Sequence, residues 1–177
     1  FDVRFNKGGT VDLGRAKVTM VNAAHSSSLD GADGPIYAGH ESGYMIAGEG
    51  QVIYVSGDTD IMADMEWMGD IHKPDIGILC AGGHFTMDMA RASYAAKRYF
   101  DFKTVIPCHY RTFPLLEQSA EVMKGELKGV EVIEPEVMPR PLSVLRAEPG
   151  AGAVIMVEQP TADGPKIWGL GTVVIAG

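Results

Sequence analysis

The chain has 177 residues, of which 46% are hydrophobic, and its 15 lysines and arginines against 23 aspartates and glutamates give a formal net charge of −8. Glycines and prolines are spread along the chain, which excludes a collagen-like or disordered protein. Without a run of lysines or arginines the chain is not expected to bind nucleic acid, because neutralising a phosphate backbone requires clustered cations. We expect a single domain over residues 1–177.

The longest stretches without a charged residue, 18–29 and 76–87, are shorter than the roughly 18 apolar residues that cross a bilayer, so no membrane span is predicted. The two cysteines, Cys80 and Cys108, are too few for a disulfide framework and lack the Cys-x-x-Cys spacing of a thiol zinc site. A reducing, cytoplasmic location is therefore the default expectation. The chain opens at Phe1 without an initiator methionine, which suggests that an upstream segment has been removed.

Strands are the first elements that the sequence predicts. Residues 17–24 alternate side chains with a period of two and are enriched in β-branched types, which predicts a strand. Two apolar runs, 43–47 and 51–56, flank a Gly-Glu-Gly turn, and this pattern is typical of a β-hairpin. The second strand of this hairpin leads directly into Gly57-Asp58-Thr59.

Helices and strands alternate after this hairpin. Met62, Met65, Met68 and Ile71 recur at helical spacing, so an amphipathic helix with a methionine stripe in the core is expected. The elements predicted next are a strand at 75–81, a helix capped by Thr86, a strand at 103–106, a helix at 114–127 and further strands at 130–134, 153–158 and 166–176. The fold class is therefore α/β.

Polar residues that suit metal or acid-base chemistry follow several of these strands. His25, His84 and His109 each come just past the carboxyl end of a predicted strand, and so does Asp58. Loops at that edge are where layered α/β folds build their sites. We therefore treat these four side chains as candidates for one site.

Taken singly, each of these histidines is more often a hydrogen-bonded structural residue than a ligand, and Asp58 could be a turn residue. Two imidazoles and a carboxylate converging on one edge, however, form a ligand set that suits zinc, manganese or iron. A serine hydrolase is not favoured, because the chain has no Gly-x-Ser-x-Gly nucleophile elbow and Ser26, Ser27 and Ser28 lack flanking glycines.

Five segments in a fixed order carry a family resemblance. They are Asn6-Lys7-Gly8-Gly9-Thr10, Ala24-His25-Ser26-Ser27, Gly57-Asp58-Thr59-Asp60, Gly82-Gly83-His84-Phe85-Thr86-Met87 and His109-Tyr110-Arg111-Thr112-Phe113. Over about residues 3–138 the chain resembles the metallo-β-lactamase superfamily. Within it, the resemblance is to a branch of metal-dependent hydrolases related to ascorbate-6-phosphate lactonase and, more distantly, to phospholipase D-type enzymes that cleave N-acyl phosphatidylethanolamine. It implies an αββα sandwich, represented here mainly by its second half.

The resemblance also implies roles for three of the candidate residues. By it, His25 ligates the first metal ion, Asp58 bridges two divalent cations and His109 ligates the second cation. Zinc is the first expectation for both ions, with manganese or iron as alternatives. A bridging carboxylate holds two cations about 3.5–4 Å apart, and together they lower the pKa of a shared water. The implied activity is hydrolysis of a small-molecule lactone, amide or phosphodiester by metal-bound hydroxide, which Asp58 orients.

The superfamily's His-x-His-x-Asp-His loop is missing from this chain, which therefore holds only half of the expected metal site. We expect an amino-terminal fragment or a second chain to complete that site, or an uncovered sheet face to drive association into a homo-oligomer. The rival hypothesis is a non-catalytic binding or structural module that keeps the fold and has lost part of its metal site.

Three further residues have roles that the sequence leaves open. His84 could donate a proton to the leaving group or bind the developing oxyanion, or it could orient a metal ligand. Arg111 stands where relatives usually carry glycine after His-Tyr, and we weigh binding of an anionic substrate group equally against a surface position. Cys108 is expected to be a packed small residue rather than a ligand.

Overall fold

The computed structural model describes residues 3–112, 114–135, 154–156 and 172–174. The chain divides into two compact units, residues 1–26 with 41–135 and residues 27–40 with 136–177. The helices are α1 Met65–His72, α2 Met89–Tyr99 and α3 Glu121–Glu126. The strands are β1 Thr10–Asp12, β2 Ala16–Asn22, β3 Ser28–Gly31, β4 Gly34–Tyr37, β5 Ser42–Gly48, β6 Gln51–Val55, β7 Ile76–Cys80, β8 Thr104–Cys108, β9 Glu131–Val132, β10 Val154–Met156 and β11 Thr172–Val174.

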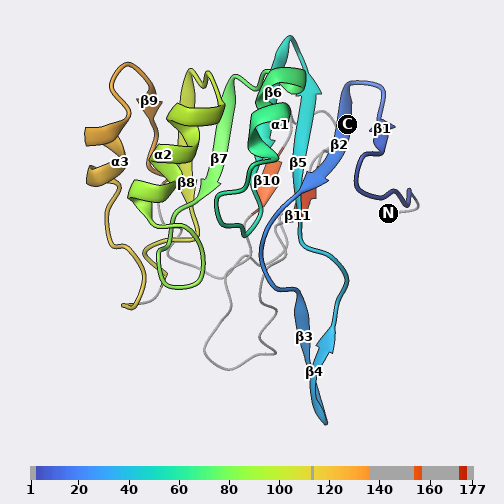
Figure 1. The fold of residues 1–177 in the computed structure, drawn as a ribbon. Coiled ribbons are helices and arrows are strands. Elements are labelled where there is room, and N and C mark those ends of the chain that lie inside the picture. The colour runs from blue at the N-terminus through green and yellow to red at the C-terminus, as the bar shows by residue number, and fades with distance from the viewer. Residues whose placement is uncertain (1–2, 113, 136–153, 157–171, 175–177) are drawn as a thin grey trace. The chain divides into compact units, whose positions relative to one another are not determined.

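The first unit is built on a seven-stranded sheet in the order β1-β2-β5-β6-β7-β8-β9. Strands β1, β2, β5 and β6 are antiparallel neighbours, whereas β6, β7, β8 and β9 run parallel to one another. Parallel neighbours need crossover connections, and α1, α2 and α3 lie in the three crossovers. All three helices cover the same face of the sheet (Figure 1). The α/β class predicted from the sequence is confirmed.

The core of this unit lies between the sheet and the helices. Met45 and Tyr54 are register partners on β5 and β6, and both are at most 1% exposed. Met65 and Met68 of α1 pack into the same cluster as these two residues. Met65 and Met68 therefore belong to the core, as predicted. Met62, in contrast, precedes the helix and is only partly buried, and Ile71, expected in the same stripe, is 69% exposed.

The opposite face of the sheet is also apolar. Ile46, Ile53 and Ile76 are register partners across β5, β6 and β7, and alternation along a strand places them on the face away from Tyr54. None of these three isoleucines belongs to the cluster that contacts the helices. Apolar side chains on both faces are typical of a sheet that is covered on both sides, as in a layered sandwich.

Two local predictions are wrong, and the structure supplies the reasons. The helix expected over 114–127 begins only at Glu121, because the Glu117 N–H donates to the Gly82 carbonyl and the Glu117 carbonyl accepts the Arg111 N–H. These bonds tie the segment to neighbouring loops instead of to a helical turn. The cap of α2 is Asp88 rather than Thr86, since the Asp88 carboxylate accepts the Arg91 N–H at 2.7 Å.

The second unit contains two short antiparallel hairpins among its described residues. Strands β3 and β4 pair so that Leu29 faces Ile36, and β10 pairs with β11. The strands predicted at 153–158 and 166–176 contain β10 and β11, and the rest of those two ranges lies outside the described residues. No helix in the described part of the chain is long and apolar enough to cross a bilayer.

Candidate metal site

The four candidate site residues follow strands that run in one direction. β2 and β6 are both antiparallel to β5, and β6, β7 and β8 are parallel, so the carboxyl ends of β2, β6, β7 and β8 meet at one edge of the sheet. His25, Asp58, His84 and His109 lie in the loops that follow these strands. The topology thus brings the predicted residues to the edge where α/β folds build sites.

Asp58 and His109 face each other at this edge. The Asp58 Oδ2 and His109 Nε2 atoms are 3.6 Å apart, and the two side chains are 20% and 23% exposed. This distance is too long for a direct hydrogen bond. It suits two ligands that share a cation, because donors about 2.0–2.2 Å from one tetrahedral zinc ion lie about 3.3–3.6 Å apart. The pair therefore fits a divalent metal ion.

His109 is held against the backbone of Gly82. A Cβ atom added at Gly82 would lie 2.0 Å from the His109 carbonyl oxygen and 2.9 Å from its Nδ1 atom. Nδ1 is buried and has no hydrogen-bond partner among the described residues, an arrangement that is rare in folded proteins. From the sequence, Gly82-Gly83 is interpreted as a turn that presents His84. The structure adds the contact between Gly82 and His109. In the sequence, the double glycine is the one sign of this contact.

The loop that carries Asp58 is anchored to β7. Ser56 is fully buried, and its hydroxyl accepts the Cys80 N–H at 3.0 Å and donates to the Gly57 carbonyl at 2.7 Å. Gly57 has a φ of +62°, and a Cβ atom there would lie 2.4 Å from the Ser42 carbonyl oxygen. Only glycine meets both requirements, so the sharp turn before Asp58 depends on it.

His25 is engaged with two backbone carbonyls. Its Nδ1 atom lies 2.8 Å from the Ser26 oxygen, and its Nε2 atom lies 2.8 Å from the Phe85 oxygen. Burial disfavours the charged ring, but these two hydrogen bonds and the negative charge of Asp58 outweigh burial and raise the pKa of His25 above its ordinary value. A metal ligand needs a free lone pair, so His25 could ligate only after one of these bonds breaks.

The pair of Asp58 and His109 is thus the part of the predicted ligand set that the structure brings into position. Within the described residues, no group of three or more histidine, cysteine, aspartate or glutamate side chains is arranged to hold a metal ion. His25 comes to the same edge of the sheet but points its ring nitrogens elsewhere. Asp58 and His109 are therefore two donors in position to bind a metal ion. His25 could become a third donor only after it releases one of its backbone carbonyls.

His84 lies beside His25 rather than beside Asp58. The two histidines line a cavity of about 320 Å³, together with Ala24, Thr59, Asp60, Gly83, Phe85, Thr86 and Arg91. The His84 ring is exposed and contacts the Phe85 ring edge-on, with 4.5 Å between the ring centroids. An exposed imidazole at the wall of a cavity is accessible to a small molecule, which suits a proton donor better than a ligand-orienting residue.

Arg111 is paired with a carboxylate. Its guanidinium lies 3.6 Å from Glu134, which also accepts the Tyr110 hydroxyl at 3.1 Å and forms an ion pair with Lys124. The hydrogen bond from Lys124 is the main reason why the pKa of Glu134 is lowered, so Glu134 stays charged opposite Arg111. This arrangement favours the surface role of Arg111 over the substrate-binding role.

The two cysteines are neighbours in the sheet, because Cys80 and Cys108 are register partners on β7 and β8. Both are free thiols, and burial raises the pKa of each above its ordinary value. A protonated thiol is a poor metal ligand. The expectation that Cys108 is packed rather than ligating is consistent with these surroundings.

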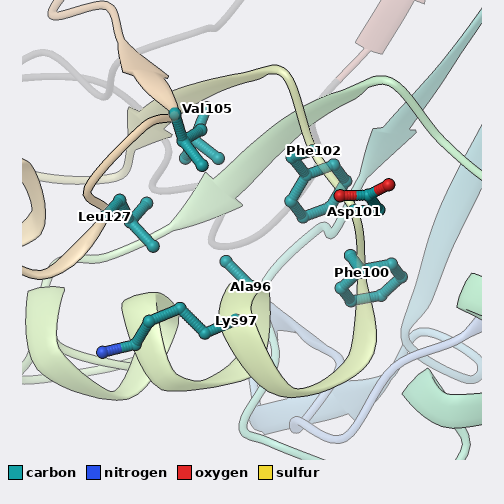
Figure 2. A pocket seen from close by; sticks show the side chains of 8 residues that line it. Ala96, Lys97, Phe100, Asp101, Phe102, Val105 and Leu127 are labelled. Carbon is teal, nitrogen blue, oxygen red and sulfur yellow. The ribbon is translucent and has the colours of Figure 1, made fainter.

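A second cavity, of about 200 Å³, lies at the end of α2 (Figure 2). Phe100 and Phe102 stack in its wall with 4.7 Å between their ring centroids, and Lys97 and Asp101 supply its charged groups. None of the candidate site residues lines it. It is therefore a gap in the packing of α2 rather than part of the site.

Comparison with known proteins finds similar hydrolases. No family model matches the chain. A UPF0173 metal-dependent hydrolase from Paracoccus denitrificans is 81% identical over 139 residues, and one from Cereibacter sphaeroides is 76% identical over 136 residues. These alignments cover 78% and 77% of this chain but only 60% and 59% of the relatives. The chain therefore spans about three fifths of the length of the curated relatives that it matches.

Solved structures agree with these relatives. Igni18, a metallo hydrolase from the archaeon Ignicoccus hospitalis, superposes with a TM-score of 0.63 at 27% identity, over 76% of this chain and 57% of that one. The metallo-β-lactamase fold protein YhfI from Bacillus subtilis superposes with a TM-score of 0.55 at 12% identity, over 76% of this chain and 52% of that one. The chain has the metallo-β-lactamase fold and is similar to UPF0173 metal-dependent hydrolases. The names of these relatives in the superfamily specify no substrate, so the narrower resemblance to ascorbate-6-phosphate lactonase stays a prediction.

Proposed function

We propose that this chain is the part of a metallo-β-lactamase superfamily hydrolase that contributes Asp58 and His109 to a divalent metal site. The observation that carries this proposal is the pair of donor atoms 3.6 Å apart at the carboxyl edge of the sheet. The names of the relatives, which are metal-dependent hydrolases, support the same chemistry. Zinc is the metal we favour, with manganese or iron as alternatives and two ions in the complete site.

The residues of this chain would divide the work as follows. Asp58 and His109 would hold the metal, and His25 would join them once its bond to the Phe85 carbonyl is released. A divalent cation held there would lower the pKa of a water and polarise the substrate's oxygen. His84 delivers a proton to the leaving group from the wall of the neighbouring cavity. The substrate we propose is a small molecule with a lactone, amide or phosphodiester bond, and an anionic group on it would meet Arg111 only by displacing Glu134.

The remaining ligands come from outside the set that this chain brings together. A catalytic zinc site has three protein ligands, and the described residues present two that face each other. We propose that an amino-terminal segment, on an associated fragment or a second chain, supplies the others. A homo-oligomer is the other way in which the apolar sheet face would be covered. The free thiols suit a reducing compartment, which we propose to be the cytoplasm.

The alternative is a non-catalytic module of the same fold. The observation that favours it is His25, whose two ring nitrogens are both committed to carbonyl oxygens. In that case the site would be a structural remnant, and the Asp58 and His109 side chains would share no cation.

Metal content decides between these two functions. Asp58→Asn keeps the shape of the side chain and removes its charge, so it should lower both bound metal and hydrolysis in the protein isolated together with any associated chain. Asp70→Asn, on α1, is the matched control and should change neither quantity. Elemental analysis of both variants, with circular dichroism to confirm the fold, is the measurement. Equal metal content in the Asp58→Asn protein and its parent would reject the metal role of Asp58.

A further inference from the structure

The side chain of Thr59, next to Asp58, ties the Asp58 loop to the end of β2. Thr59 is fully buried, and its hydroxyl accepts the Ala24 N–H at 2.9 Å and donates to the Asp60 carbonyl at 2.8 Å. The Asp60 N–H in turn donates to the Ala24 carbonyl at 2.9 Å. Both backbone polar groups of Ala24, the residue that precedes His25, are therefore bonded to residues that follow Asp58.

The backbone of Thr59 ties the same loop to the segment that carries His84. The Thr59 carbonyl accepts the Met87 N–H at 3.4 Å and the Cys80 thiol at 3.4 Å. Cys80 ends β7 and Met87 follows His84, so both ends of the connection that contains His84 contact Thr59. One buried residue thus bonds to the three segments that bring the candidate site residues to the edge of the sheet.

We propose that Thr59 is the positioning residue that sets where His25 and His84 lie relative to Asp58. It is not a catalytic residue, because its hydroxyl hydrogen is donated to Asp60 and its hydroxyl oxygen accepts from Ala24. Only the description of these three residues as parts of one active site rests on the proposed function. The hydrogen bonds themselves do not.

A comparison with Ser56, the other buried hydroxyl near Asp58, shows why loss of the Thr59 hydroxyl should disturb the positions of the site segments more. The Ser56 hydroxyl links the loop to the Cys80 N–H, where β7 and β6 are already joined as neighbouring strands. The Thr59 hydroxyl instead bonds to the segment beyond the end of β2, which no strand pairing among the described residues holds to the loop and which the Asp60 N–H bond to the Ala24 carbonyl joins at one further point. Loss of the Thr59 hydroxyl should therefore loosen the Ala24 segment, whereas the strands would still hold the Ser56 connection.

Three variants test this role in the intact chain. Thr59→Val keeps the shape of the side chain and removes the hydroxyl, Thr59→Ser restores the hydroxyl, and Ser93→Ala removes a buried hydroxyl from α2, where it donates to the Met89 carbonyl. The measurements are amide hydrogen exchange at Ala24 and the imidazole resonances of His25, with His72 as an internal reference. Neither measurement requires metal.

Loss of one net hydrogen bond of about 1 kcal/mol corresponds to about a fivefold change in an equilibrium. Thr59→Val should therefore raise the exchange rate at Ala24 about fivefold or more and shift the His25 and His84 resonances. Thr59→Ser should restore them, and Ser93→Ala should lower stability without moving them. Unchanged exchange and resonances in Thr59→Val, or equal shifts in Ser93→Ala, would overturn the proposal. Thr59→Ala adds no atom and takes the place of Thr59→Val if that variant does not fold.

Titration with Zn²⁺ separates this inference from the proposed function. Removing a group that orients metal ligands typically lowers metal affinity about 10–100-fold, and we expect a loss in that range for Thr59→Val with recovery in Thr59→Ser. If no variant and no parent protein binds Zn²⁺, the proposed function fails while the exchange and resonance measurements still decide the role of Thr59. If Zn²⁺ binds equally to the parent protein and Thr59→Val, the positioning role is refuted and the metal site stands.

Discussion

Replacing Gly82 with alanine is the most direct test of how the site is built. The added methyl group would lie 2.0 Å from the His109 carbonyl oxygen, and real Cβ atoms essentially never come within 3.0 Å of another heavy atom. One of the two backbones would thus have to move by about 1 Å or more. The Ala81 N–H donates to the Cys108 carbonyl and the Glu117 N–H donates to the Gly82 carbonyl, so both sides are anchored and resist that movement.

Overpacking of this kind costs about 1–3 kcal/mol, and the anchored backbone places Gly82→Ala at about 3 kcal/mol. With a urea dependence of about 2 kcal/mol per molar, the unfolding midpoint should fall by about 1.5 M. Gly125→Ala is the matched control, because Gly125 lies in α3 with no atom within 4 Å of an added Cβ. That variant should gain up to about 1 kcal/mol from helix propensity.

The assay is urea unfolding followed by circular dichroism, together with the imidazole resonances of His109. Gly82→Ala should shift these resonances because the added methyl group also lies 2.9 Å from Nδ1. The reasoning is refuted if Gly82→Ala unfolds within about 0.5 kcal/mol of the parent chain and leaves the His109 resonances in place.

Three further predictions have separate readouts. His109→Ala should release metal, which metal analysis measures. His84→Ala should retain metal and slow turnover by about 10²–10⁴-fold, and a substrate with a good leaving group should reduce this loss if His84 is the proton donor. Arg111→Gly should be about 1 kcal/mol more stable than Arg111→Ala in urea unfolding, because both lose the exposed ion pair but only glycine relieves the φ of +66°. Hydrogen bonds from Lys103 and a backbone N–H lower the pKa of Asp75 in the folded chain. The stability that the ionised carboxylate contributes should therefore be lost as the pH falls from the ordinary aspartate range toward this lower pKa. Asp75→Asn should reduce this loss of stability at acid pH, which melting temperatures measured across that pH range would show.

The parts of the site that the sequence could predict are those that depend on short-range patterns. Asp58 and His109 follow apolar runs with strand periodicity, and parallel strands bring their carboxyl ends to one edge whatever the details of packing. The fold class follows from the same alternation of strands and helices. These predictions do not depend on contacts between loops that are distant in the sequence.

The parts that the sequence could not predict depend on contacts between loops. The turn at 114–120 replaces the expected helical start because its backbone bonds to Gly82, which is remote in sequence. The orientation of His25 depends on the Phe85 carbonyl, another loop contact, and nothing in the neighbouring residues indicates it. Intrinsic helix and turn preferences are worth tenths of a kcal/mol per residue, so a few tertiary hydrogen bonds override them.

In the proposed site, the state of His25 would link the arrival of the missing ligands to binding of the metal. Recruiting His25 as a third ligand would break its bond to the Phe85 carbonyl, which is worth about 1 kcal/mol net. Because 1.4 kcal/mol is a factor of ten in affinity, the loss of this bond would weaken metal binding by about fivefold. A segment that brings further ligands offsets this loss, since the metal is then held by more donors when His25 turns. Metal affinity should therefore rise more steeply on adding that segment than its own ligands alone would produce, and a His25→Ala variant should bind metal through Asp58 and His109 without that steep rise.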